Sequence, residues 1–84
     1  MKVEEVVLKL NKIEDISITS YKQEEEKSVI KGFYNGKEFF ITLYRNTYII
    51  KIIEKGGVSK SIEGTIDSTD MGILRDLKML GSRL

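Results

Sequence analysis

The side chains that most often carry catalysis are missing from this sequence, which contains no histidine and no cysteine. Histidine is the commonest general base, and histidine and cysteine supply nearly all zinc sites. Carboxylates gather in two places, at Glu24, Glu25 and Glu26 and at Asp67 and Asp70. We interpret the first group as a solvated turn rather than a metal site, and the second as a helix cap rather than an acid/base pair. The sequence therefore predicts a protein that is not an enzyme and that holds no metal or cofactor.

Lysine and aromatic side chains offer a second kind of chemistry, because cations contact phosphates and rings stack on nucleobases. Lys31, Phe40 and Lys51 lie far apart along the chain, so they can act together only if strands and turns bring them together.

Three turns predict how those strands pair. Asn35-Gly36 is the strongest signal, because both central positions of a type I′ turn need positive φ. A two-residue turn at Arg45-Asn46 and a three-residue loop at 55–57 continue the same register. We expect Lys31 opposite Phe40, Phe40 opposite Lys51, and Lys51 beside Ser61.

This register divides the sheet into two faces. We assign to the core the face that contains Ile30, Phe39, Ile41, Leu43, Tyr48, Ile50, Ile52 and Ile62. The other face mixes apolar, hydroxyl and basic side chains, namely Val29, Lys31, Phe33, Phe40, Thr42, Ile49, Lys51, Ile53, Ser59 and Ser61. Gly32 and Gly64 interrupt strand-like runs, which predicts bulges or sharp bends and a curled sheet.

Helical spacing of apolar residues predicts a helix at each end of the chain. Val3, Val6, Val7 and Leu10 indicate the first, over about residues 2–12, and the run 16–22 alternates like a half-buried strand. After the cap-forming residues 67–70, the second helix carries Ile73, Leu74, Leu77, Leu80 and Leu84. We expect a single α+β domain over residues 1–84, with a five-stranded antiparallel meander that is either open and curled or closed as an SH3-like barrel.

Composition limits the classes of protein to which the chain can belong. Its 84 residues are 40% hydrophobic and 32% charged, which is typical of a small soluble domain with a thermophile-like composition. No apolar run approaches the roughly 18 residues of a membrane span, and the N-terminus lacks the features of a signal peptide, so we expect a cytoplasmic protein. The net charge of +1 divides into −2 over residues 1–28 and +3 over residues 29–84, which is far from strongly basic.

Three explanations account for the second face. A terminal helix covers it, a protein partner or second copy of the chain binds it, or nucleic acid binds it through the row of Lys31, Phe40 and Lys51.

The order of the second part of the chain resembles a known family over about residues 29–80. An FYNGKEF hairpin, an IIKIIEKGG strand and turn, a further strand and a GILRDLKML helix resemble the small archaeal non-histone chromatin proteins. That resemblance implies an SH3-like barrel that binds the DNA minor groove through a three-stranded sheet, with contacts near Thr47, Ile49, Lys51, Ile53 and Ser61. We therefore expect a DNA-associated binding module, either a direct binder or an accessory subunit of a replication or chromatin assembly. The candidate residues are Lys31, Phe40, Thr47, Ile49, Lys51, Ile53 and Ser61, and the alternative is a protein-interaction module or homodimer.

Overall fold

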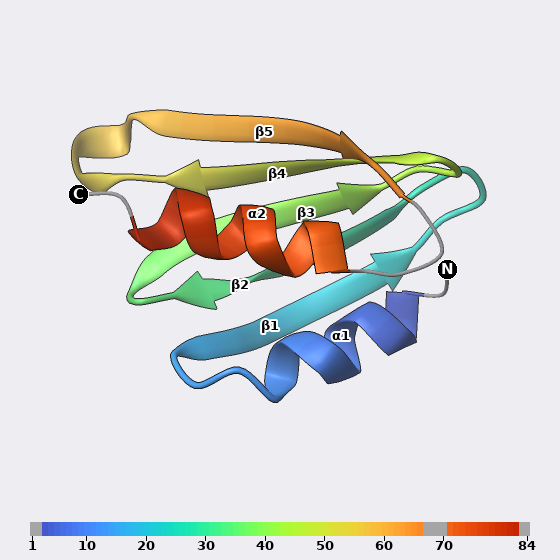
Figure 1. Cartoon of the computed structure of the whole chain (residues 1–84), viewed down its shortest axis with the longest axis horizontal. Coiled ribbons are helices and arrows are strands. Elements are labelled where there is room, and N and C mark those ends of the chain that lie inside the picture. The colour runs from blue at the N-terminus through green and yellow to red at the C-terminus, as the bar shows by residue number, and fades with distance from the viewer. Residues whose placement is uncertain (1–2, 67–70, 83–84) are drawn as a thin grey trace.

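The computed structural model describes residues 3–66 and 71–82, which form two helices and one five-stranded sheet (Figure 1). The elements in chain order are α1 (Val3–Asn11), β1 (Ile16–Gln23), β2 (Ser28–Tyr34), β3 (Lys37–Leu43), β4 (Thr47–Ile53), β5 (Ser59–Thr65) and α2 (Met71–Ser82). A short 3₁₀ turn, Lys55–Gly57, joins β4 to β5. The predicted α+β class and element order are confirmed, while the expected cap at 67–70 and the expected core residue Leu84 lie outside the described residues.

The sheet is an antiparallel meander with the strand order β1-β2-β3-β4-β5. Asn35 and Gly36 have φ values of 53° and 79°, as a type I′ turn requires. Gly56 and Gly57, with φ values of 85° and 84°, both have positive φ in the loop between β4 and β5. The pairings predicted from these turns are confirmed along β2, β3, β4 and β5.

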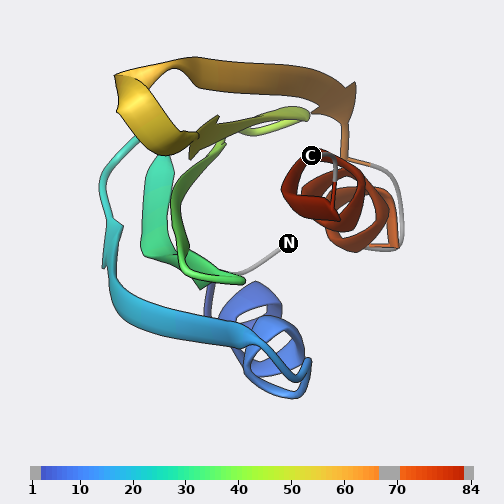
Figure 2. The ribbon, with the colours of Figure 1, turned by 90° about the vertical axis from the view of Figure 1, so that its left-hand side faces the viewer.

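The sheet is not closed into a barrel, so the SH3-like alternative is wrong. β1 and β5 are the two edges of the sheet, and in the described residues they do not pair with each other. Figure 2 shows the sheet curled like an open letter C, with both helices on its concave side. α1 packs mainly against β1, and α2 packs against β4 and β5. The helices therefore occupy the space that the two edges would have to cross in order to meet.

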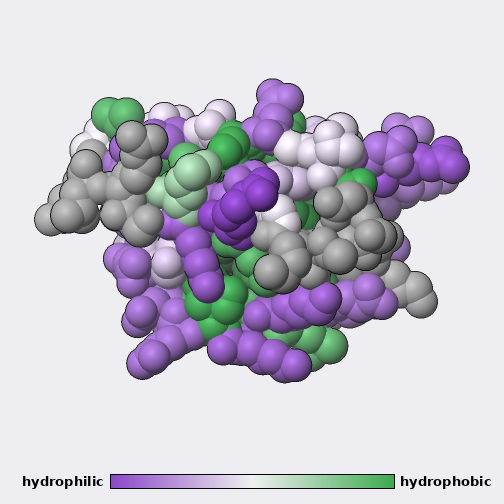
Figure 3. All heavy atoms as spheres, viewed as in Figure 1, coloured by the Kyte–Doolittle hydropathy of each residue, from purple (hydrophilic) through white to green (hydrophobic). Residues whose placement is uncertain are grey.

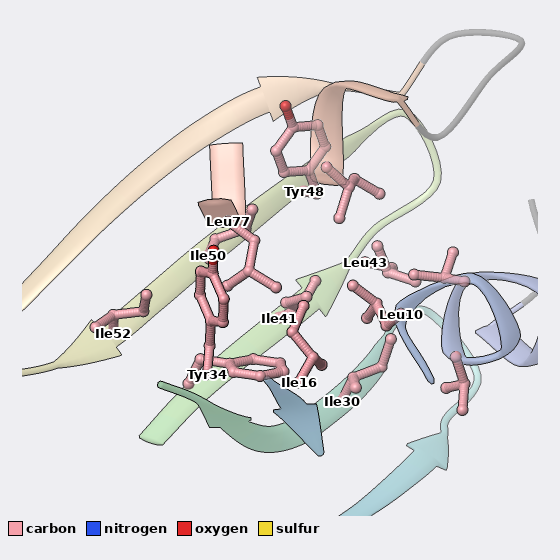
Figure 4. Packing of buried hydrophobic residues seen from close by; sticks show 14 of the residues in the cluster. Leu10, Ile16, Ile30, Tyr34, Ile41, Leu43, Tyr48, Ile50, Ile52 and Leu77 are labelled. Atoms are coloured by element: carbon pink, nitrogen blue, oxygen red, sulfur yellow. The ribbon is translucent and has the colours of Figure 1, made fainter. Parts of the chain in front are cut away.

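The core lies between the concave face of the sheet and the two helices (Figure 4). Side chains alternate along each strand, so the inward residues of β2, β3 and β4 form one apolar layer. The helices add residues at helical spacing, and each large aliphatic side chain that is buried contributes about 1.5–3 kcal/mol. The buried apolar residues are Val3, Val6, Val7, Leu10, Ile16, Ile30, Tyr34, Phe39, Ile41, Leu43, Tyr48, Ile50, Ile52, Ile73, Leu77 and Leu80. The predicted core face is confirmed, with Ile62 only partly buried at its edge.

The two strand glycines both make room for an aromatic ring of a neighbouring strand, Phe39 beside Gly32 and Tyr48 beside Gly64, but the strand pairing around them differs. The register shift predicted near Gly32 lies on β1, between Ile18 and Ser20, and Gly32 pairs with Ile18 beside it. Gly64 pairs regularly with Tyr48, so the bulge expected there is absent. A Cβ at Gly64 would overlap the Tyr48 hydroxyl, which shows that this glycine makes room for the tyrosine ring.

Candidate nucleic-acid interface on the outer sheet face

The convex face of the sheet, which we call the outer face, points away from both helices (Figure 2). Its middle is a line of five paired residues that crosses all five strands. We call this line the central row, and it consists of Ser20, Lys31, Phe40, Lys51 and Ser61. Neighbouring strands lie about 4.8 Å apart, so the five backbone positions span about 19 Å.

The central row places one cation on each side of an aromatic ring. Lys31 and Lys51 are exposed and Phe40 is half-buried between them. The Nζ atom of Lys31 lies 5.6 Å from the centroid of the Phe40 ring, within the range of a cation–π contact. The Thr19 hydroxyl donates a hydrogen bond of 3.1 Å to the Lys31 carbonyl oxygen, at the bulge of β1. The backbone that presents Lys31 is therefore held from both of its neighbouring strands.

The rows on either side of the central row contain the acidic residues of the outer face. On one side, Glu63 pairs with Ile49. On the other side, Glu38 pairs with Phe33. The central row itself has no carboxylate, so its two ammonium groups face no acidic partner within the row.

All seven candidate residues lie on the outer face, but not all of them lie close together. Lys31, Phe40, Lys51 and Ser61 belong to the central row, as the register predicted. Ile49 and Ile53 flank Lys51 two positions away along β4, on the same face. Thr47 begins β4 and pairs with Thr65, about 13 Å along the strand from Lys51. Thr47 therefore lies next to Ile49 but away from the central row.

The outer face is open to solvent. Every described residue on it is exposed or half-buried, and the Phe33 side chain keeps 40% of its surface accessible. Both helices pack on the opposite side. The alternative in which a terminal helix covers this face is therefore wrong, which leaves the nucleic-acid and protein-partner explanations.

The helix side of the molecule looks different, since polar and charged residues dominate it (Figure 3). Leu8 on α1 and Met79 on α2 are 62% and 44% exposed. Single exposed apolar side chains of this kind are normal on soluble proteins. The helix side therefore offers no comparable candidate site.

The acidic group Glu24–Glu26 forms a solvated turn between β1 and β2, as the sequence indicated. The Glu24 amide donates a hydrogen bond of 2.8 Å to the Lys27 carbonyl oxygen, and all three glutamates are exposed. Lys22 lies 3.9 Å from the Glu24 carboxylate. In the described part of the chain, no group of three acidic side chains is arranged to hold a metal ion.

Sequence reasoning missed a buried polar contact that holds α2 on the concave side. Asp76, which is 5% exposed, accepts a hydrogen bond of 2.5 Å from the Tyr48 hydroxyl through Oδ2. Its other oxygen, Oδ1, accepts one of 3.3 Å from Arg75 Nε. The available signal was the position of Asp76 three residues after Ile73, on the apolar face of the helix.

A second missed cluster joins β3, β4, β5 and the end of α2. The Glu54 carboxylate lies 3.1 Å from Lys37 Nζ and 3.6 Å from Lys60 Nζ. Lys37 also donates a hydrogen bond of 3.4 Å to the Gly81 carbonyl oxygen near the end of α2. The hydrogen bond from Lys37, aided by the charges of both lysines, holds the pKa of Glu54 below its ordinary value. Lys37 and Lys60 thus serve the fold on the concave side and do not extend the outer face.

Comparisons with protein-family models, with curated proteins and with solved structures found no match to this chain. The resemblance to archaeal chromatin proteins therefore stays a prediction that rests on the residues quoted for it. Among the described residues, no helix has the length and apolar character needed to cross a membrane.

Proposed function

We propose that this chain is a small non-catalytic binding module whose outer face binds DNA, either directly or as an accessory subunit of a replication or chromatin assembly. The central row is the observation that carries the proposal. It places one exposed lysine on each side of the Phe40 ring and contains no acidic residue. Phosphates are bound by cations and bases by aromatic rings, so one nucleotide segment can use both.

Serine hydroxyls at the ends of the row support the same function. Ser20 and Ser61 are exposed next to Lys31 and Lys51. Hydroxyl groups commonly donate hydrogen bonds to phosphate oxygens, which positions the protein on the nucleic acid without recognising its base sequence. The module would therefore bind with little sequence preference.

The test is a titration of fluorescein-labelled DNA followed by anisotropy at low and moderate salt. Two phosphate contacts predict a loss of affinity of about tenfold between about 50 and 200 mM salt. Lys51→Ala should reduce that salt dependence, whereas Lys78→Ala removes an exposed lysine from α2 on the other side and should leave it unchanged. Failure to bind any DNA at the lower salt concentration would overturn the proposal.

A protein partner or a second copy of the chain is the alternative function, and a separate observation favours it. Four apolar side chains of the outer face, Val29, Phe33, Ile49 and Ile53, lie outside the core and remain accessible. An apolar interface would persist at high salt, because screening acts on charges. Light scattering over a range of concentrations tests self-association. If it gives one monomer mass at every concentration and in high salt, the homodimer is excluded.

A further inference from the structure

We infer that the outer face takes single-stranded nucleic acid in preference to a duplex, laid along the central row and across the strands. This inference rests on the proposed function and names its ligand more closely. It differs from the minor-groove binding of a duplex that the resemblance implies.

The curvature of the sheet is the first argument. The outer face is convex, because the sheet bends around the core and both helices (Figure 2). A duplex is also convex, so the two surfaces would meet along a narrow line. A single-stranded nucleic acid is flexible and can follow a curved surface, so its sugar-phosphate backbone can stay near successive β-strands of the sheet.

The supply of cations is the second argument. On the part of the outer face that the structure describes, the lysines are Lys22, Lys31 and Lys51. Duplex-binding proteins commonly contact about six to ten phosphates. Three lysines, two of them in one row, match a short single-stranded segment better than a duplex site.

The distribution of charge on the outer face indicates the path of the single-stranded nucleic acid. Glu38 and Glu63 lie in the rows on either side of the central row, so a phosphate backbone is repelled from both sides over β3 to β5. Over β1, Lys22 shares the row of Glu63 and attracts phosphate there. Along the row, Lys31 and Lys51 are two strand spacings apart, or about 10 Å. Phe40 lies between them, where a base can stack while the lysines contact the flanking phosphates. The span of about 19 Å corresponds to a footprint of about four nucleotides, at the lower end of known site sizes for single strands.

The contact between Lys31 and Phe40 gives the inference a distinctive consequence. The ammonium group lies over the ring at 5.6 Å, so a stacking base must displace it toward a phosphate. Lys31→Ala therefore removes a phosphate contact but also uncovers the ring. Lys51→Ala removes a phosphate contact alone. We expect Lys51→Ala to weaken binding more than Lys31→Ala does.

The test compares the full chain with labelled oligothymidine of about twelve nucleotides and with a duplex of the same length, by anisotropy in low salt. We expect the single strand to bind at least about tenfold more tightly. Its affinity should fall with salt with a logarithmic slope of about −1.4, reduced to about −0.7 in Lys51→Ala. Phe40→Leu, which keeps an apolar side chain, should weaken single-strand binding by about tenfold, and circular dichroism checks that it folds. Ser61→Glu gives an independent variant, because it adds a carboxylate to the row.

Each result decides between the two proposals. If the duplex binds as tightly as the single strand, the preference for single strands is wrong and the proposed function stands. If neither ligand binds, the proposed function itself is wrong. If the single strand binds but neither Phe40→Leu nor Ser61→Glu weakens it, the central row is not the site and the inference fails.

Discussion

Replacement of Tyr48 by phenylalanine should destabilise the protein by about 2 kcal/mol. The Tyr48 ring is 2% exposed, and its hydroxyl donates to Asp76 Oδ2 at 2.5 Å. The variant removes this donor, so Asp76 Oδ2 loses its hydrogen bond from Tyr48 although Asp76 is only 5% exposed. Hydrogen bonds to charged groups contribute about 1.5–3 kcal/mol, which sets the expected loss. For a domain of this size, that loss lowers the melting temperature by roughly 8–16 °C.

Thermal unfolding followed by circular dichroism measures the effect, with Tyr44→Phe as the matched control. Tyr44 is 40% exposed, so loss of its hydroxyl should change stability by less than about 0.5 kcal/mol. Asp76→Leu completes a double-mutant cycle. If the Tyr48 hydroxyl acts through Asp76, Tyr48→Phe should have little effect in that background. An unchanged melting temperature in Tyr48→Phe, or an equal loss with and without Asp76, would refute the reasoning.

Three further predictions test the fold and the outer face. Glu54→Gln should have a lower melting temperature than the wild type at pH 7. Because Lys37 holds the folded-state pKa of Glu54 below its ordinary value of 4.5, the ionised carboxylate contributes its full stability above about pH 4.5. The difference in melting temperature between the two proteins should therefore shrink as the pH falls further. Gly81→Ala should cost about 1–3 kcal/mol in chemical unfolding, because the added Cβ would overlap the Tyr34 ring. Ser20→Glu adds a carboxylate beside Lys31, so it should weaken DNA binding in the anisotropy titration without lowering the melting temperature.

The pairing of the strands could be predicted from the sequence because its cause is local. Asn35-Gly36 favours a type I′ turn through the φ preferences of those two residues alone. Once this turn and the two-residue turn at Arg45-Asn46 are in place, the period-two alternation of a strand assigns the residues of β2, β3 and β4 to one face or the other. For this reason the sequence alone places Lys31, Phe40 and Lys51 in one row, and the observed register agrees.

The closure of the sheet and the positions of the helices could not be predicted in the same way. The curl of a sheet accumulates over many small twists, and the spacing of apolar residues shows that a helix has a buried face but not which face of the sheet it meets. Asp76 illustrates the difficulty, since its buried carboxylate is accommodated on an apolar helix face by Tyr48, a residue 28 positions away in the sequence, together with Arg75. The exposure of the candidate site therefore depends on tertiary packing, which local sequence patterns do not encode.

The β-strand propensity of some residues explains part of the composition of the outer face, whether or not a ligand binds there. Val29, Ile49 and Ile53 are β-branched residues, which suit a half-buried pleated surface whether or not a partner covers it. Lysines on an exposed face also keep a sheet soluble and separate from its neighbours. Solubility, however, requires charge of either sign at any position, so it would scatter lysines and glutamates over the rows. In the central row, by contrast, the charged side chains are Lys31 and Lys51 alone, one on each side of a ring. Glu38 and Glu63 lie in the neighbouring rows, and Lys22 shares its row with Glu63. A central row that carries positive charge alone is what an anionic ligand requires and what solubility does not.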